Sequence, residues 1–494
     1  MPGRYVVQTF GCQMNVHDSD RMEEVLGAHG WRPSADVETA DLIVFNTCSV
    51  RERAEQKLRS EVGKLAPLKQ QRPELVIAVA GCVAQQEGEK LLARIPHIDL
   101  VVGPDNLGEL PALVNDHMSG GVRLARTVFD LDAPRFLAAE PRPGEAPVST
   151  FVTTMKGCDE RCSFCIVPTT RGPERYRPAR EIVEETARWV AAGAREITLL
   201  GQTVDSFRDP LLPPPESDDP DESQFPELLR LLAREVPGLT RLRYTSPHPR
   251  HATASLVRAH RDLDVLARHV HMPVQSGSNR MLRRMIRRYT REEYLERTRA
   301  LVGARPGITL STDIIVGFPG ETEADFLETL SLVREAGFTS LFAFKYSPRP
   351  GTPSTRLPDD VTEAEKSDRL ARLFAVGEEL GRAHLGALVG TRQEVLVHGA
   401  SKGKSGTFEG RTAQNEIVHV EVPSSVGPSV VGALVEVTVT AAYKHSLAGA
   451  PTAAALAKLA ELALRAPRRV PEKRRRLLPL APPPAAVDVT PGEP

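Results

Sequence analysis

Six cysteines are the residues of this 494-residue chain whose spacing points most directly to chemistry. Three of them, Cys158, Cys162 and Cys165 (the central triad), have three and then two residues between them. Thiolates this close together can ligate three irons of a cubane cluster, because soft sulfur ligands suit iron–sulfur centres. The motif supplies no fourth ligand, so one iron would keep an open coordination position where a substrate can bind. We therefore predict a catalytic iron–sulfur cluster here.

A zinc site is the alternative interpretation of the same three thiols. Structural zinc normally takes four Cys or His ligands, and the nearest histidine after the motif is His248. The motif also follows a predicted strand, at the end of a barrel where such enzymes carry their active sites. Both observations favour an iron–sulfur cluster over zinc.

The other three cysteines share a position relative to predicted strands. Cys12, Cys48 and Cys82 (the N-terminal triad) each come just after a strand, and they are 36 and 34 residues apart. The carboxyl ends of parallel strands lie along one edge of a sheet, where ligands bind. Three unrelated buried thiols are the alternative, but the repeated placement favours thiols that meet at one edge. Disulfides are disfavoured, because a large chain without an export signal stays reduced.

The elements that carry the cysteines form two α/β runs. In the first, strands and helices alternate, which predicts a doubly wound parallel sheet. After a Pro- and Ala-rich linker at 134–149, about six further strand–helix units predict an incomplete (β/α) barrel. Residues 209–224 interrupt it with a Pro-rich acidic insertion, which we interpret as a surface loop. The predicted strands are 4–9, 41–46, 75–80 and 98–102 in the first run, and 151–155, 196–200, 242–244, 270–274, 309–316 and 340–346 in the second.

The end of the chain has a different pattern. After about residue 388, short strands separated by Gly, Ser, Lys and Pro predict a small antiparallel β-barrel. From 453 the chain is rich in Ala, Pro and Arg, and we predict a largely disordered basic tail. Its segment 465–476 has seven basic residues and one acidic residue, which fits a solvated end and an RNA contact equally well.

Composition sets the broad class of the protein. With 41% hydrophobic and 26% charged residues, the chain has ordinary globular composition. No apolar run approaches the roughly 18 residues that a membrane span needs, and the first residues lack a secretory leader. We therefore predict a cytoplasmic protein that does not contact a membrane. The net charge of −1 gives no overall sign of nucleic-acid binding.

Several motifs together resemble a known family. CDERCSFC has the CxxxCxxC spacing of radical SAM enzymes, which bind S-adenosylmethionine (SAM). GCQMNVHDSD, FNTCSVRERAEQK and AVAGCVAQQEG are similar to the N-terminal domain of methylthiotransferases, and SFCIVPTTRGPERYRP and STDIIVGFPGETEADF are similar to their radical SAM core. The segment SPRPGTPS, followed by the small β-domain, resembles the RNA-binding TRAM domain and the residues that precede it. HMPVQSGS and RRYTREEY resemble most the branch that makes 2-methylthio-N6-isopentenyladenosine in tRNA.

The resemblance, which covers about residues 3–455, implies three domains and a redox reaction. It implies two 4Fe–4S clusters: one on the central triad, which binds SAM, and one on the N-terminal triad, which supplies the methylthio group. A SAM-derived radical would take hydrogen from C2 of adenine, a step beyond any side-chain acid or base. We expect no catalytic residue besides the cluster ligands, and expect tRNA, a low-potential electron donor and a sulfur donor as partners. The expected domains are a methylthiotransferase domain at 3–120, a radical SAM core at 145–385, a TRAM-like domain at 388–452 and the tail at 453–494.

Other residues are candidates for contact with SAM or RNA. The candidates for SAM contact have structural alternatives. A tight turn explains the segment 317–320 equally well, and helix N-capping is the alternative for the segment 275–278. The segment 280–291 contains six arginines and no acid, and suits either tRNA phosphate contact or a solvated helix. The candidates for SAM contact are Gln275, Ser276, Gly317, Phe318, Pro319 and Gly320. The further basic candidates are Arg241, Arg243, His248, Arg250, His251, Lys402, Lys404 and Arg411.

One segment departs from the family pattern. Relatives usually have Gly-Gln-Asn-Val-Asn after the second barrel strand, whereas this chain has Thr203 and Asp205 at the two Asn positions. The change bears on substrate recognition and affects no cluster ligand. Two alternative functions stay open. One is methylthiolation of threonylcarbamoyladenosine in tRNA or of a ribosomal protein, and the other is a non-catalytic, metal-bound RNA-binding protein.

Overall fold

The computed structural model describes residues 2–49, 52–132, 134–402 and 406–463. They belong to two compact units, Met1–Leu137 and Ala138–Pro471. Within the described ranges, no helix is long and apolar enough to cross a membrane.

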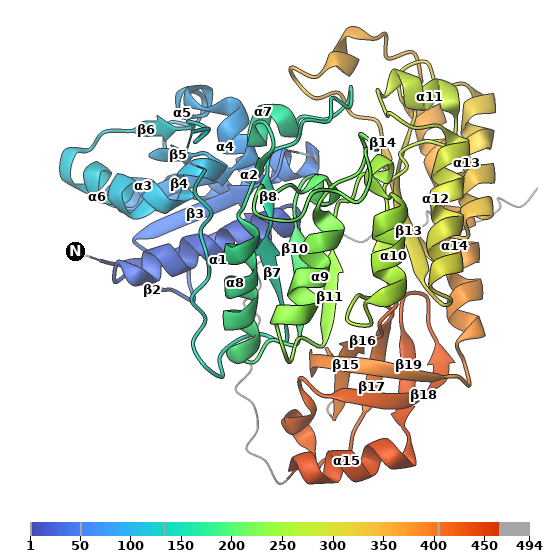
Figure 1. Cartoon of the computed structure of the whole chain (residues 1–494). Helices are drawn as coiled ribbons and strands as arrows, with labels where there is room; N and C mark the ends of the chain where they lie inside the picture. The colour runs from blue at the N-terminus through green and yellow to red at the C-terminus, as the bar shows by residue number, and fades with distance from the viewer. Residues whose placement is uncertain (1, 50–51, 133, 403–405, 464–494) are drawn as a thin grey trace, which may run out of the picture. The chain divides into compact units, whose positions relative to one another are not determined.

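The first unit is a doubly wound parallel sheet, as predicted. Its elements are β1 (Arg4–Phe10), α1 (Gln13–Ala28), β2 (Arg32–Pro33), β3 (Leu42–Thr47), α2 (Glu52–Lys64), α3 (Ala66–Gln71), β4 (Val76–Gly81), α4 (Cys82–Glu87), α5 (Glu89–Arg94), β5 (Leu100–Val102), α6 (Leu110–Gly120) and β6 (Leu124–Arg126). The strand order is β2-β1-β3-β4-β5-β6, and all neighbouring strands are parallel. Along β3, Ile43 and Phe45 pack with α2, whereas Leu42 and Val44 pack with α1. Helices therefore cover both faces of the sheet (Figure 1).

The second unit begins with an open barrel of six parallel strands. Its strands are β7 (Ser149–Thr153), β10 (Glu196–Leu200), β11 (Arg241–Tyr244), β12 (His269–His271), β13 (Thr309–Val316) and β14 (Ser340–Lys345). Its outer helices are α8 (Ala179–Ala191), α9 (Phe225–Glu235), α10 (Ala254–Asp262), α12 (Arg291–Ala304), α13 (Glu323–Ala336) and α14 (Glu363–Ala387). The strands pair as β11-β10-β7 and β12-β13-β14, and an isolated bridge from Leu242 to Leu266 connects the two halves. This arrangement confirms the predicted incomplete (β/α) barrel.

A small closed β-barrel follows, in the order β15-β16-β17-β19-β18. Its strands are β15 (Arg392–Ala400), β16 (Thr407–Arg411), β17 (Ile417–Glu421), β18 (Leu434–Ala442) and β19 (Leu447–Pro451). Four of its pairings are antiparallel, as predicted, but β17 and β19 run parallel. The sequence predicted four strands here, 393–398, 407–410, 417–422 and 434–440, and the prediction was incomplete because it did not include β19.

The predicted disordered tail is wrong for its first residues. Residues Ala453–Ala463 form helix α15, in which Ala455 and Leu459 are buried against the small barrel. Alanine and leucine have high helix propensity, and their spacing provides one apolar face. The remainder of the predicted tail, 464–494, lies outside the described residues.

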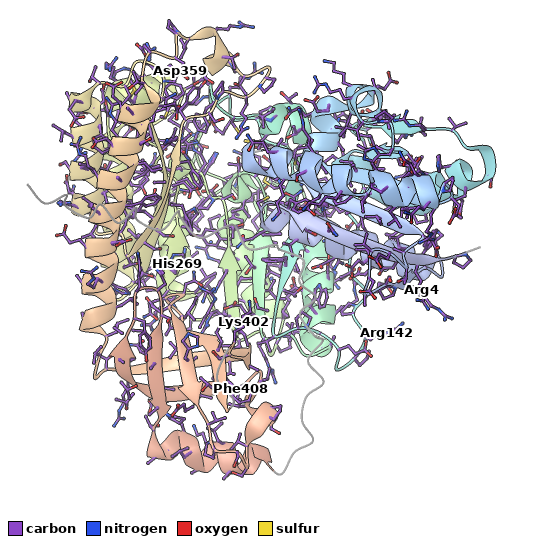
Figure 2. All side chains as sticks on the ribbon, turned by 180° about the vertical axis from the view of Figure 1, so that it is seen from behind. Arg4, Arg142, His269, Asp359, Lys402 and Phe408 are labelled. Atoms are coloured by element: carbon purple, nitrogen blue, oxygen red, sulfur yellow. The ribbon has the colours of Figure 1, made fainter. Side chains whose placement is uncertain are left out.

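A buried charge network joins the two barrels of the second unit. Glu196, the first residue of β10, accepts a hydrogen bond from Arg243 (2.8 Å) and lies 3.4 Å from Arg241. The same two guanidinium groups donate to the backbone carbonyls of Arg411 and Thr412 in the small barrel. Arg241 and Arg243, two candidates for RNA contact, therefore act as structural links. Figure 2 shows the two barrels end to end, with His269 labelled in one and Phe408 in the other.

Candidate metal centres

Strand register brings the N-terminal triad to one edge of the sheet. The neighbouring strands β1, β3 and β4 place Phe10, Thr47 and Gly81 level with one another. Cys48 and Cys82 follow this row directly, and Cys12 comes two residues after it. Neighbouring strands are about 4.8 Å apart, and a Cβ atom added at Gly11 would overlap the Cβ of Cys48. The predicted meeting of three strand ends at one edge is therefore present.

A neutral polar network lies directly beneath this triad. The Asn15 side-chain amide donates to Asn46 Oδ1 (2.9 Å), and Asn46 donates to the Asn15 carbonyl (2.8 Å) and to Ser19 Oγ (2.9 Å). The hydroxyl groups of Ser19 and Thr9 lie 2.7 Å apart. All four residues are buried, so these hydrogen bonds are costly to break. The network links the start of α1 to the ends of β1 and β3 and thereby fixes the cysteine backbone.

Glycine is required immediately before Cys82. Gly81 has φ +91° and ψ −158°, a conformation that is essentially restricted to glycine. A Cβ atom there would overlap Asn46 Oδ1 and lie 2.9 Å from the carbonyl oxygen of Thr47. The tight turn therefore directs the chain from β4 into α4 with Cys82 as the first helical residue.

The central triad lies in one loop that distant segments hold in place. Ser163, between two of the cysteines, receives a hydrogen bond on its carbonyl from the Ser354 NH (2.8 Å). Its own NH and hydroxyl donate to the carbonyls of Met285 (2.9 Å) and Arg284 (2.8 Å). Gly157, before the first cysteine, has φ +79°, and a Cβ atom there would overlap the Pro173 carbonyl oxygen. The loop conformation therefore depends on residues more than 100 positions away.

Two thiols of the central triad have side-chain partners from other loops. Cys158 Sγ lies 3.0 Å from Thr203 Oγ1, and Arg287 Nη1 donates to Cys162 Sγ at 3.2 Å. Burial, opposed in part by Thr203 and reinforced by Cys165, raises the pKa of the Cys158 thiol to about 12. Burial and the neighbouring Cys162 raise the pKa of Cys165 to about 12. Ligation of metal would therefore release protons from these thiols.

The thiols of each triad lie in the same region, but their side chains do not have the geometry of a metal site. Within the described part of the chain, no three Cys, His, Asp or Glu side chains form a set that could hold a metal ion. Cys12 Sγ donates to Asn15 Oδ1 (3.3 Å), and the central thiols contact Thr203 and Arg287. The donor chemistry still fits iron–sulfur clusters, because each triad offers three soft sulfur ligands.

Buried polar groups close to the central loop lack hydrogen-bond partners. Asp205 Oδ1 accepts from the His248 NH (2.8 Å), and His248 Nε2 lies 4.0 Å from Glu160. Among the described residues, Asp205 Oδ2, His248 Nε2, Glu160 Oε2 and both amide atoms of Gln202 have no hydrogen-bond partner. Burial raises the pKa of Asp205 well above its usual range and lowers the pKa of His248. Unpaired buried polar atoms are costly, so a polar ligand would stabilise this region.

The candidates for SAM contact form internal contacts in the structure. Gln275 has φ +74° and pairs through its backbone with β13, and Ser276 Oγ lies 3.3 Å from Thr329 Oγ1. In the turn after β13, added Cβ atoms would meet the Lys366 side chain at Gly317 and the Arg284 side chain at Gly320. The structure thus supports a tight turn at 317–320. Contact of this turn, with Phe318 and Pro319, and of Gln275 and Ser276 with SAM stays a prediction.

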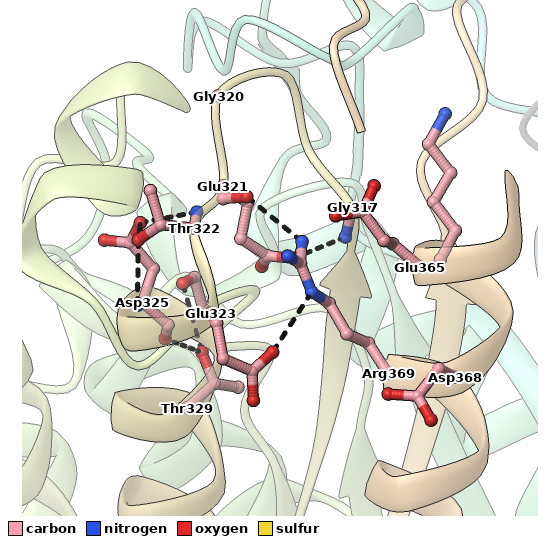
Figure 3. A network of polar contacts seen from close by, with 12 residues as sticks. Gly317, Gly320, Glu321, Thr322, Glu323, Asp325, Thr329, Glu365, Asp368 and Arg369 are labelled. Atoms are coloured by element: carbon pink, nitrogen blue, oxygen red, sulfur yellow. Dashed lines mark hydrogen bonds and ion pairs between the residues drawn. The ribbon is translucent and has the colours of Figure 1, made fainter. Parts of the chain in front are cut away.

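A buried ion pair that sequence reasoning missed holds this turn. Glu321 Oε2 accepts from the Gly317 NH (2.7 Å) and from Arg369 Nη1 of α14 (2.9 Å), as Figure 3 shows. Burial outweighs these interactions and raises the pKa of Glu321 to about 7. The position of Glu321 directly after a Gly-Phe-Pro-Gly turn was the available signal. Its partner, 48 residues later in the sequence, could not be found from local pattern.

Four of the six arginines in the segment 280–291 make contacts within the protein. Arg280 pairs with Asp325, Arg284 donates to the Pro319 carbonyl (3.0 Å), and Arg291 pairs with Glu335. Arg287 is buried against the central triad, which disfavours contact of this residue with tRNA. Arg280 is exposed, and Arg284 and Arg291 are partly exposed, so their contact with tRNA phosphate stays a prediction. Arg283 and Arg288 are exposed, as is Lys402 in the small barrel, whereas Lys404 lies outside the described residues.

Comparison with known proteins gives a consistent assignment. Residues 4–103 match "Uncharacterized protein family UPF0004", residues 152–333 the "Radical SAM superfamily", and residues 386–452 the "TRAM domain". A protein of Sorangium cellulosum named tRNA-2-methylthio-N(6)-dimethylallyladenosine synthase is 62% identical over 472 residues, which are 92% of this chain and 94% of that protein. A protein of the same name from Chromobacterium violaceum is 44% identical over 90% of this chain and 97% of its own length. The solved structure of the radical SAM methyltransferase TsrM from Kitasatospora setae has a TM-score of 0.48 at 14% identity over 82% of each chain.

Proposed function

Because the chain belongs to the family of tRNA-2-methylthio-N(6)-dimethylallyladenosine synthases, we propose that it adds a methylthio group to C2 of N6-isopentenyladenosine beside the tRNA anticodon. Isopentenyl is another name for the dimethylallyl group. The observation that carries the proposal is the presence of two cysteine triads in two separate compact units. One triad alone would support SAM cleavage, and the second is needed to supply sulfur.

Each part of the chain has a separate task in this proposal. Cys158, Cys162 and Cys165 hold the cluster that binds SAM, and the N-terminal triad holds the second cluster. When bound, the first cluster and SAM supply a radical that can take hydrogen from an inert C–H bond. The barrel excludes water from that reaction. In the proposed division, 3–120 carries sulfur, 145–385 performs the radical step and 388–452 contacts RNA.

The polar groups near the central loop suit a nucleobase. Asp205 and His248 are both buried, and burial raises the pKa of Asp205 and lowers the pKa of His248, so it opposes the charged form of each. Together with Gln202 they offer unpaired polar atoms that can form hydrogen bonds with a ligand. An adenine edge is polar and uncharged, and it would satisfy such groups.

An apolar surface inside the barrel suits the prenyl group. Lys345 of β14 donates a hydrogen bond to Ser367 on α14, so its side chain lies on the helix-covered face of the strand. Phe342 and Phe344 lie three positions and one position before Lys345. Side chains an odd number of positions apart on a strand point to opposite faces, so both rings lie on the other face. Phe342 packs edge-on against His271 of β12 and keeps 55% of its surface exposed, and Phe344 keeps 39%. Burial of a five-carbon chain there could contribute a few kcal/mol, at about 0.8 kcal/mol per CH₂.

The test offers the reconstituted enzyme matched tRNAs with and without the prenyl group, under anaerobic conditions with SAM, dithionite and sulfide. Mass spectrometry of the nucleosides should show a methylthio group only on the prenylated tRNA. Equal modification of both tRNAs would remove the prenyl requirement. Product only on threonylcarbamoyl-modified tRNA would assign the chain to the related branch, and zinc without iron would favour a non-catalytic RNA-binding protein.

We also propose a cytoplasmic location, a low-potential electron donor and a separate sulfur donor.

A further inference from the structure

We propose that Arg287 and Thr203 are positioning residues that donate hydrogen bonds to two thiolates of the central cluster and thereby raise its reduction potential. The inference rests on the proposed function in one respect, namely that the central triad carries a 4Fe–4S cluster. It assigns a role to two side chains from different loops, one of them at a position where this chain departs from the usual family residue.

Arg287 is held rigidly against Cys162. Its Nη1 donates to Cys162 Sγ (3.2 Å), its Nη2 donates to the Pro273 carbonyl (3.1 Å), and its Nε donates to Tyr289 OH (2.8 Å). The Tyr289 hydroxyl lies 2.9 Å from the Val274 carbonyl oxygen, which fixes it in turn. These contacts use both NH₂ groups and the Nε of the planar guanidinium, so the cation cannot easily turn away from the sulfur.

Within the described residues, no carboxylate forms an ion pair with the Arg287 guanidinium. The partners of Arg287 are a thiol, a backbone carbonyl and a phenol, and the side chain is 9% exposed. A buried cation without an anionic partner is costly. When Cys162 becomes a thiolate ligand, the ion pair is completed. The geometry thus anticipates negative charge on Cys162.

Thr203 makes the corresponding contact with Cys158. Its Oγ1 lies 3.0 Å from Cys158 Sγ, and the residue is 2% exposed. A thiolate ligand carries no proton, so in the cluster-bound state only the hydroxyl group can donate. The Thr203 carbonyl accepts from both the NH (3.0 Å) and the Oγ (2.9 Å) of Ser206, which fixes the turn that carries the hydroxyl.

Hydrogen bonds to cluster sulfurs favour the reduced state. Reduction adds one electron, taken from a low-potential donor, and one negative charge that is shared by the sulfur ligands. A cation and a hydroxyl donor beside those sulfurs stabilise the added charge more than the original state. Loss of either donor should therefore make the cluster harder to reduce, with the ligands and the iron unchanged.

The experiment is an EPR-monitored redox titration of the full chain in a Cys82→Ala background, so that only the central cluster contributes. Arg287→Met and Thr203→Val, the second nearly isosteric, should each lower the midpoint potential. We expect at least a tenfold change in the reduction equilibrium for Arg287→Met, which is about 59 mV for a one-electron couple. Arg287→Lys should restore part of the loss. Arg288→Met, an exposed neighbour, is the matched control and should have no effect.

The readouts separate this inference from a structural role and from the proposed function. Unchanged potentials in Thr203→Val and Arg287→Met, both with full iron content, would overturn the inference. If Arg287→Met binds no iron, the potentials of Thr203→Val and Arg287→Lys decide the question. A wild-type chain that carries the central cluster and makes no methylthio product would overturn the proposed function and leave this inference intact.

Discussion

The N-terminal triad takes its three thiols from the ends of three strands, whereas the central triad takes its three thiols from one loop. The first depends on the register of β1, β3 and β4 and is supported by neutral amide and hydroxyl groups. The second depends on tethers from distant segments and faces the cation of Arg287. The difference shows that a site can be assembled by sheet topology or by loop spacing. Each route leaves different groups around the thiols.

The largest expected effects come from substituting one cysteine in each triad, because SAM cleavage and methylthio transfer should then be lost separately. Cys158→Ala should abolish SAM cleavage and retain about four of eight irons, because the two triads lie in separate units. Cys82→Ala should retain SAM cleavage and lose methylthio transfer. Iron analysis and chromatography of 5′-deoxyadenosine measure both outcomes. Loss of all iron in either variant would contradict independent sites.

A glycine substitution tests how strictly the N-terminal triad depends on sheet geometry. Gly81→Ala should destabilise the first unit by about 3 kcal/mol, because alanine is strained at φ +91° and overlaps Asn46. Iron bound to that unit should fall accordingly. Gly27→Ala in α1, where nothing lies within 4 Å of the added Cβ, is the matched control. Thermal unfolding that is equal for both variants would contradict the steric argument.

A pH series tests the buried charges that support the second unit. Burial opposes ionisation of Glu196, but Arg243, His398 and Arg241 outweigh it and lower its pKa to about 2 from 4.5. A carboxyl group whose pKa is lower in the folded state stabilises the fold at pH values above its unfolded-state pKa. This stabilisation is lost as the pH falls through the folded-state pKa. At about 1.4 kcal/mol per pKa unit, Glu196→Gln should cost on the order of 3 kcal/mol at pH 7.

Denaturant unfolding of wild type and Glu196→Gln at several pH values provides the measurement. The difference in unfolding free energy should shrink between about pH 4.5 and 2. A difference that stays constant down to pH 2 would show that Glu196 stabilises the junction without ionisation.

The smallest expected effect concerns one tether of the central loop. Ser163→Ala removes the hydroxyl donor to the Arg284 carbonyl (2.8 Å) and leaves the backbone bonds to Met285 and Ser354 in place. The loss should be about 1 kcal/mol, the usual size for one hydrogen bond. The central cluster should still form with full iron content. Loss of that iron would show that the loop depends on a single tether.

The sequence alone determined most of the elements and led to the prediction of the cysteine ligands. Cysteine spacing is local, and strand and helix periodicities are short, so the doubly wound sheet, the open barrel and both triads followed from pattern. The tail prediction failed at α15, because its Ala- and Leu-rich residues are helical and meet an apolar surface that the sequence does not display.

Only the tertiary structure decided which polar groups meet. Arg287 contacts Cys162 across 125 residues, and Arg241 reaches the Arg411 carbonyl across 170. Six arginines within twelve residues looked alike in the sequence, yet four of them contact different partners and only Arg287 among these four is buried. A guanidinium group carries the same charge in every setting, and its role depends on what the fold places within about 3 Å of it. That placement results from the packing of the whole barrel.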